Sequence, residues 1–186
     1  MRIIGGARRG LKLADVGEGD AAAHLRPTSD RVREAIFNLL INAHGNPVTG
    51  ARVLDLFAGT GALGLEALSR GAAEVTFVDD GTKALTLMKS NIAKMRMEVQ
   101  SRILRQNVTR LGVNAGAMFT LVFLDPPYGK GLGEAALTSA QKGGWLAPEA
   151  MVVWEEGVPV TVPEGFAVVD RRKYGDTIVT LLRAPA

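Results

Sequence analysis

The chain has 186 residues, a formal net charge of +3 and 47% hydrophobic residues, which is enough for one domain with a substantial core. It contains no cysteine, which excludes disulfide bonds, cysteine-ligated zinc and thiol catalysis. Its apolar runs are shorter than the ~18 residues of a membrane span, and the apolar part of residues 1–6 is too short for a secretion signal. His24 and His44 have no carboxylate–histidine motif around them. We therefore expect a cytoplasmic protein with no membrane association and no metal.

Three clusters of basic residues stand out against this mild net charge. The first 13 residues contain four basic side chains and no acid, and the other clusters lie at 26–33 and 171–173. Clustered Arg and Lys are typical of a surface that contacts a nucleic-acid backbone, and solvated surface charge is the alternative. The residues that we expect to bind nucleic-acid phosphates are Arg2, Arg8, Arg9, Lys12, Arg26, Arg31 and Arg33.

The first part of the chain predicts a small extension. Residues 2–14 alternate loosely and contain Gly5-Gly6 and Gly10, which predicts a short hairpin, and residues 15–27 predict a loop. Thr28-Ser29-Asp30 can cap a helix that ends near residues 44–47. The apolar face of that helix is Val32, Ala35, Ile36, Leu39 and Leu40.

From residue 52 onward, strands and helices alternate. The patterns predict strands over 53–57, 74–79, 101–106, 119–125 and 150–155, and helices over 61–70, 82–95 and 132–142. Residues 166–173 and 177–183 then predict a hairpin with no intervening helix. This order predicts an α/β fold with a mostly parallel sheet, helices on both faces and a C-terminal antiparallel hairpin. We expect residues 1–47 to form an extension packed on a main unit, 48–186, so that the chain is effectively one domain.

The segment from Asp55 to Gly64 joins the first of these strands to its helix. Its glycines permit a tight turn and a close backbone approach, and the helix then offers unpaired N–H groups. The spacing of Gly59, Gly61 and Gly64 also matches a dinucleotide-binding loop. Asp55 decides against that interpretation, because a carboxylate there would repel a pyrophosphate and attract a cation such as the ammonium group of S-adenosylmethionine.

Polar residues after the next two strands extend this candidate cofactor site. Asp79, with Asp80 as a weaker candidate, stands where an acid binds ribose hydroxyls, which NAD and S-adenosylmethionine share. Asn107 could bind the adenine amino group with Val108 packed on the ring, or it could cap a turn. The candidate cofactor residues are Asp55, Phe57, Ala58, Gly59, Thr60, Gly61, Asp79, Asp80, Asn107, Val108 and Thr28.

The most informative motif is Asp125-Pro126-Pro127-Tyr128, which follows the apolar strand at 119–124. The prolines fix φ and remove two N–H donors, so their carbonyls can point into a cleft. Tyr128 adds a flat face on which a planar ligand can stack. These groups suit the capture of an exocyclic amino group of a nucleobase, and a turn with a packing tyrosine is the alternative. We take Asp125, Pro126, Pro127 and Tyr128 as the candidate catalytic residues.

With these motifs, the chain resembles a class I S-adenosylmethionine-dependent methyltransferase, and more narrowly the bacterial small-subunit (16S) ribosomal RNA guanine-N2 methyltransferases of the RsmD type. The matching segments are residues 2–6, 25–38, 53–71, 123–128 and 174–177. The segment Arg26–Asn38 within them is far more specific than the glycine loop, because generic methyltransferases lack it.

The resemblance implies a seven-stranded, Rossmann-like methyltransferase sheet and assigns roles to individual residues. Asp55, Ala58, Gly59 and Gly61 would hold the methionine and ribose parts of the cofactor, Asp79 the ribose diol, and residues 125–128 the target base. Members often have Glu at the position of Asp79 and Asp at that of Asn107. The first difference keeps the chemistry, whereas the second removes a charge from the adenine contact.

The implied reaction is methyl transfer to the N2 amino group of a flipped guanine in small-subunit ribosomal RNA, within a particle or an assembly intermediate. Thr28 and Arg26 would cross the mouth of the cleft, although Thr28 could simply cap its helix. Trp145 and Trp154 are expected in the core or at its rim, and the protein is expected to be a monomer.

Three rival functions remain open at this level. An adenine-N6 methyltransferase acting on DNA or RNA uses a similar acid–Pro-Pro–aromatic motif, often with Asn in the first position. An NAD(P)-dependent oxidoreductase would use the glycine loop but leaves residues 125–128 unexplained. A non-catalytic RNA-binding module would have no use for Asp125 and Tyr128.

Overall fold

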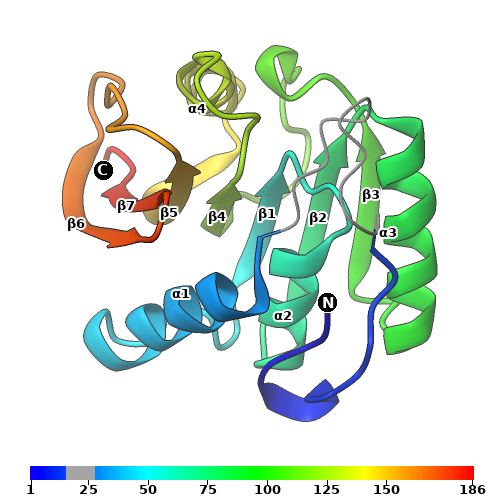
Figure 1. The fold of residues 1–186 in the computed structure, drawn as a ribbon. Helices are drawn as coiled ribbons and strands as arrows, with labels where there is room; N and C mark the ends of the chain where they lie inside the picture. Colours follow the sequence, from blue (N-terminus) through cyan, green and yellow to red (C-terminus); the bar gives the residue numbers. More distant parts are fainter. Residues whose placement is uncertain (16–27) are drawn as a thin grey trace.

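The computed structural model of the protein describes residues 1–15 and 28–186 (Figure 1). The strands are β1 (Arg52–Leu56), β2 (Glu74–Asp79), β3 (Ser101–Arg105), β4 (Phe119–Leu124), β5 (Leu146–Glu156), β6 (Ala167–Tyr174) and β7 (Thr177–Arg183). The helices are α1 (Asp30–Ala43), α2 (Ala62–Ser69), α3 (Thr82–Met95) and α4 (Leu132–Lys142), with 3-10 turns η1 (Gly6–Arg8) and η3 (Val108–Arg110).

Within the described residues, the seven strands form one sheet in the order β3-β2-β1-β4-β5-β7-β6. Strands β1 to β5 are parallel to their neighbours, and β7 and β6 close the sheet as an antiparallel hairpin. This confirms the predicted fold class. Because β1 to β5 share one direction, their carboxyl ends lie along the same edge of the sheet.

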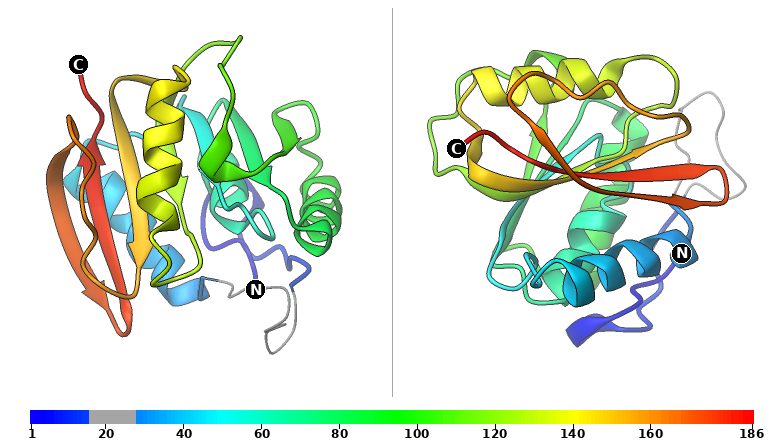
Figure 2. Two further views of the ribbon diagram at one scale, coloured as in Figure 1. Left: turned by 90° about the horizontal axis from the view of Figure 1, so that it is seen from above. Right: turned by 90° about the vertical axis from the view of Figure 1, so that its left-hand side faces the viewer.

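Helices cover both faces of the sheet, and two apolar layers result (Figure 2). Residues of α1, α2 and α3 pack with Val53 of β1 and Phe77 of β2 on one face. Residues of α4 and the turn at η3 pack with Leu54 and Leu56 on the other. Adjacent residues of β1 therefore enter different layers, as the period of two along a strand requires.

The N-terminal segment is docked on α2. The buried carboxylate of Glu66 accepts hydrogen bonds from the backbone N–H groups of Ile4 at 2.9 Å and Gly5 at 2.8 Å. Gly6 has a φ of +77°, and a Cβ there would lie 1.8 Å from the carbonyl oxygen of Ser69, so only glycine fits. The expected hairpin at 2–14 is reduced, among the described residues, to one antiparallel bridge between Arg2 and Lys12 around η1.

Most predicted boundaries agree with the structure to within one or two residues, and those of β2, α3, α4 and β7 agree at both ends. The exception is β5, which begins at Leu146 rather than Ala150. Pro148 and Glu149 are poor strand residues, so the pattern hid this extension. A register shift against β4 between Phe119 and Leu121 and a φ of +60° at Glu149 accommodate it.

The remaining expectations for packing are confirmed or refined. Trp145 and Trp154 are both buried. Ser29 rather than Thr28 caps α1, because its hydroxyl accepts from the N–H of Val32 at 3.2 Å. None of the helices in the described parts of the chain has the length and apolar character needed to cross a membrane.

Candidate active site

Four carboxylates lie at the carboxyl ends of adjacent parallel strands. Asp55 and Asp79 are at the ends of β1 and β2, Asp125 follows β4, and Glu155 is near the end of β5. The register pairs Leu56 with Val78 and with Leu124, and Leu124 with Trp154. The four residues are therefore brought to one edge of the sheet from positions up to 100 residues apart (155 − 55).

The glycine-rich loop after β1 is held between two of these carboxylates. Oδ2 of Asp79 accepts from the N–H of Gly59 at 2.9 Å, and its Oδ1 accepts from Gly81 at 2.8 Å. Oδ2 of Asp55 accepts from the N–H of Gly64 at 2.9 Å. Phe57 and Gly61 have φ values of +59° and +79°, so the chain turns sharply before α2 begins. The loop thus presents its backbone at the carboxyl edge, as the sequence predicted.

The electrostatics of this edge favour a cation. Asp55 is only 1% exposed, and burial raises the pKa of its carboxyl well above the ordinary value, opposed by the Gly64 hydrogen bond and reinforced by the charges of Asp125 and Asp79. Each acid is therefore held among like charges. A positively charged ligand at the loop would relieve that repulsion, whereas a pyrophosphate would increase it.

The motif at residues 125–128 leaves β4 beside β1. The N–H of Asp125 donates to the carbonyl of Leu56 at 3.4 Å, so the motif starts next to the glycine loop. The hydroxyl of Tyr128 lies 3.2 Å from Oγ1 of Thr177 at the start of β7. A Cβ at Gly157 would lie 2.9 Å from Cδ2 of Tyr128, so this glycine makes room for the ring. The half-buried tyrosine is thereby fixed beside the acids.

Thr28 and Glu155 join this site. Oγ1 of Thr28 lies 3.0 Å from Oδ2 of Asp125 and 3.3 Å from Oε1 of Glu155. Thr28 was predicted at the cleft, and the structure brings it to the acids. Glu155 was not predicted, although the pair Glu155-Glu156 at the end of an apolar strand was a usable signal.

Asn107 and Val108 lie after β3, beside the same edge. Oδ1 of Asn107 accepts from the N–H of Thr109 at 2.9 Å and from its hydroxyl at 2.7 Å, so Asn107 caps η3. Of the two roles considered for Asn107, the cap is present in the structure. Val108 is buried, and Asp80 is exposed.

The expected RNA-binding residues fall into two groups. Arg33 contradicts the expectation: it is 0% exposed, its Nη2 lies 2.8 Å from Asp30, and its Nη1 donates to the carbonyl of Thr28 at 3.3 Å. It also donates to the carbonyl of Arg2. The helix phase turns Arg33 inward beside Ile36 and Phe37, so it cannot meet a phosphate.

The remaining expected RNA-binding residues are exposed, as a phosphate contact requires, apart from one that lies outside the described residues. Arg2, Arg8, Arg9, Lys12 and Arg31 are exposed, although Nε of Arg8 donates to the carbonyl of Met95 at 3.0 Å. Arg26 lies outside the described residues. Among residues 1–15 and 28–186, no group of three or more His, Cys, Asp or Glu side chains is arranged to hold a metal ion.

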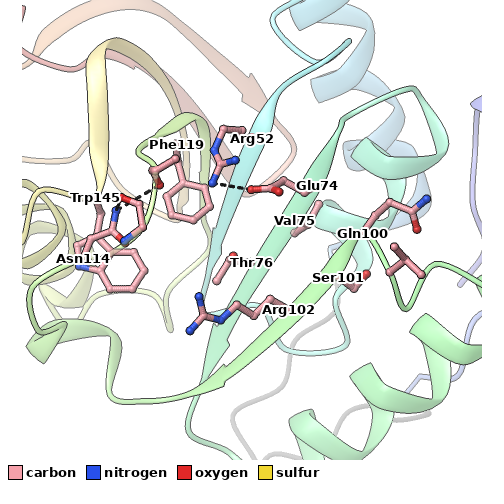
Figure 3. Close-up of a pocket in the computed structure, with 13 residues that line it drawn as sticks. Arg52, Glu74, Val75, Thr76, Gln100, Ser101, Arg102, Asn114, Phe119 and Trp145 are labelled. Atoms are coloured by element: carbon pink, nitrogen blue, oxygen red, sulfur yellow. Dashed lines mark hydrogen bonds and ion pairs between the residues drawn. The ribbon is translucent and has the colours of Figure 1, made fainter.

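The opposite edge of the sheet carries a separate pocket of about 230 Å³ (Figure 3). It is lined at the amino ends of β1 to β4 by residues that include Arg52, Glu74, Ser101 and Phe119. Arg52 forms an ion pair with Glu74 at 2.7 Å and lies 5.7 Å from the ring centroid of Phe119. None of the predicted site residues lines this pocket.

The chain is similar to known proteins in both sequence and fold. The model of the family described as "Conserved hypothetical protein 95" matches residues 1–183. The chain is 37% identical to YlbH of Bacillus subtilis (strain 168), over 98% of both chains. It is 36% identical to "Ribosomal RNA small subunit methyltransferase D" of Escherichia coli (strain K12), over 100% of this chain and 91% of the relative. The solved structure of yhhF from Escherichia coli superposes with a TM-score of 0.81 at 36% identity, over 100% and 98% of the two chains.

Proposed function

The chain belongs to the family described as "Conserved hypothetical protein 95", and from that membership and its acidic sheet edge we propose that it is an S-adenosylmethionine-dependent ribosomal RNA methyltransferase. The target is the N2 amino group of a guanine in small-subunit RNA. The full-length similarity to a protein named as a small-subunit ribosomal RNA methyltransferase supports the substrate class. One observation carries the reaction type: the amine-accepting motif at 125–128 starts next to the glycine loop, with its Asp125 N–H on Leu56 of β1.

The residues at the edge fit the proposed cofactor. S-adenosylmethionine, when bound, supplies a methyl group on a positively charged sulfonium. Buried Asp55 lies among Asp79 and Asp125, whose charges raise its pKa, and a bound cation would stabilise the ionised form of all three. Asp79 uses both oxygens on backbone N–H groups, and a carboxylate oxygen has a second lone-pair direction for a ribose hydroxyl. Gly59 and Gly61 leave the loop backbone open to close approach.

The base is proposed to bind at the adjacent motif. A guanine flipped out of its RNA stack would lie on Tyr128. The Asp125 carboxylate and the Pro126 carbonyl would accept from its N2 amino group and direct the nitrogen lone pair toward the methyl carbon. As the N–C bond formed and the bond between the methyl group and sulfur broke, leaving a neutral thioether, the amine would become acidic and Asp125 would take its proton. Positioning and electrostatics, rather than a strong base, would supply most of the rate.

The exposed basic residues of the N-terminal segment are proposed to hold the RNA. Arg8→Ala/Arg9→Ala should weaken transfer and lower the salt slope of RNA binding by about two. The matched control is Arg102→Ala/Lys142→Ala, which removes two exposed cations outside the N-terminal segment. An unchanged salt slope in the first variant would assign RNA binding to another surface.

The decisive test uses labelled S-adenosylmethionine and small ribosomal subunits that lack their modifications, followed by digestion to nucleosides. Label in N2-methylguanosine is the expected result. Label in N6-methyladenosine would move the assignment to the adenine-N6 alternative, and no transfer to RNA would contradict the proposal. We further propose that the protein acts as a cytoplasmic monomer, which sedimentation of the free protein would test.

A further inference from the structure

One hydroxyl group stands between two carboxyl groups in the active site. Oγ1 of Thr28 lies 3.0 Å from Oδ2 of Asp125, and 3.3 and 3.5 Å from the two oxygens of Glu155. A hydroxyl has one proton to donate and lone pairs with which to accept. If both carboxyls were ionised, Thr28 could serve only one of them. Both contacts are hydrogen bonds at the same time only if one carboxyl is protonated and donates to Thr28.

The surroundings of the two acids decide which one carries the proton. Glu155 is 1% exposed, whereas Asp125 is half-buried at the end of β4. Burial first, and then the charges of Asp125 and Asp55, raise the pKa of Glu155 well above its ordinary value, while the Thr28 hydrogen bond and Arg33 of α1 oppose the shift. Arg33 is also shared with Asp30 and Glu66, at 2.8 and 3.6 Å. The proton therefore belongs on Glu155.

We propose that Glu155 is a positioning residue for the methyl transfer: its protonated carboxyl donates to Oγ1 of Thr28, and Thr28 donates to Oδ2 of Asp125. This inference rests on the proposed function, because it assigns Asp125 to the amine. The relay keeps Asp125 ionised and fixes the direction of its carboxylate. If Glu155 were ionised, the Thr28 hydroxyl could donate to Glu155 instead of to Asp125. A second negative charge would also lie beside Asp125.

The relay is anchored by the buried arginine that the sequence had assigned to RNA. Nη1 of Arg33 donates to the carbonyl of Thr28 at 3.3 Å and holds the backbone from which the hydroxyl projects. Glu66, which binds the backbone of Ile4 and Gly5, lies 3.6 Å from Nε of Arg33. The N-terminal segment is thus connected to the position of Asp125 through three side chains: Glu66, Arg33 and Thr28.

The test compares Glu155→Gln with Glu155→Ala in the transfer assay. The amide of Gln can donate to Thr28 but cannot lose a proton near neutral pH. We expect Glu155→Ala to lower kcat about five- to tenfold, the equivalent of one lost hydrogen bond, with little change in KM for S-adenosylmethionine. Glu155→Gln should restore most of that loss. It should also remove the fall in kcat that the wild-type enzyme shows as pH rises through the pKa of Glu155.

A double-mutant cycle separates this role from simple packing. In a Thr28→Val background the relay is already broken, so Glu155→Ala should cause little further loss of kcat. Additive losses would overturn the proposal, as would a Glu155→Gln variant that is as slow as Glu155→Ala. Thermal unfolding of each variant identifies any that fail to fold, and Glu155→Gln keeps the side-chain volume.

A spectroscopic readout makes the test independent of the substrate. The infrared spectrum of the free enzyme should contain a protonated-carboxyl carbonyl band that is present in the wild type and absent from Glu155→Gln. Absence of this band would overturn the proposal even if transfer is normal. If the band is present but no RNA is methylated, the protonation of Glu155 stands and the proposed function fails.

Discussion

The two edges of the parallel sheet use charge in opposite ways. At the carboxyl edge, Asp55 and Glu155 are almost fully buried, and burial and like charges raise the pKa of both carboxyls. At the amino edge, Arg52 is paired with Glu74 at 2.7 Å, and both side chains are more than a third exposed. Phe119 and Trp145 stack beside that pair with their ring centroids 6.1 Å apart.

The difference indicates where the protein has concentrated unfavourable electrostatics. At the amino edge, Arg52 and Glu74 neutralise each other, so there is little charge repulsion for a ligand to relieve. The carboxyl edge keeps acids together whose repulsion a cationic ligand would reduce, which is typical of a functional site rather than a structural ion pair. Changes at the two edges should therefore have separable effects on transfer and stability.

The largest expected effect follows Asp125→Ala. Removing one positioned acceptor should lower kcat for methyl transfer by about 100- to 1,000-fold. Calorimetric binding of S-adenosylmethionine should persist, because the loop residues remain. The charge-matched control is Glu164→Ala, an exposed acid before β6, which should transfer at the wild-type rate. If Asp125→Ala lost cofactor binding instead, its assignment to the base would be wrong.

A second change tests how tightly α2, which follows the cofactor loop, is packed on the sheet. A Cβ at Gly64 would lie 2.4 Å from Phe77, 2.7 Å from Val75 and 2.9 Å from Oδ2 of Asp55. Gly64→Ala should therefore lower the free energy of unfolding by about 1–3 kcal/mol, measured by urea denaturation. At Gly112, a Cβ would meet nothing within 4 Å, so Gly112→Ala is the control. Equal stability of the two variants would mean that the α2–β2 packing adjusts freely.

A third change tests how the buried carboxyl of Asp55 makes the stability of the protein depend on pH. The pKa of Asp55 is raised in the folded state, so the folded protein binds this proton more tightly than the unfolded chain does. Its contribution to stability is then lost as pH rises from the unfolded value of about 3.9 toward the folded pKa, by up to about 1.4 kcal/mol per pH unit. Asp55→Asn keeps an acceptor for the N–H of Gly64 and should remove this share of the pH dependence.

Urea denaturation of Asp55→Asn and the wild type across that interval gives the comparison. The gain in stability of the variant over the wild type should grow with pH. Asp80→Asn, which alters an exposed neighbour of the loop, is the control. A constant difference at all pH values would mean that Asp55 is ionised at no cost.

The smallest effect is expected at the amino edge. Arg52→Ala removes a partly exposed ion pair and a guanidinium near Phe119. Such contacts contribute about 1 kcal/mol or less, so unfolding should shift only slightly. Methyl transfer should be unchanged. A clear loss of transfer would give the amino-edge pocket a part in function and would remove the contrast between the edges.

The order of the helices and strands, and the two motifs on which function depends, could be predicted from the sequence. The apolar runs predicted β1, β2 and β4 because these central strands are buried on both faces, and glycines, prolines and capping residues marked their ends. Asp55, Asp79 and Asp125 could be assigned because carboxyl ends of parallel strands meet at one edge whatever the details of packing. The division into residues 1–47 and 48–186 remains a proposal.

The partners of individual polar residues depend on tertiary packing and could not be predicted from the sequence. Arg33 belongs to a basic cluster that predicted an RNA contact, but in the structure it is buried and binds the backbone of Thr28. Its position on the inner side of the helix and the distant Glu66 determine these partners. Glu155 enters the site through a hydroxyl 127 residues away in the chain, a contact that no local pattern encodes. Desolvation depends on what covers a group from every side, so the raised pKa of Glu155 follows from the fold and cannot be predicted from its neighbours in sequence.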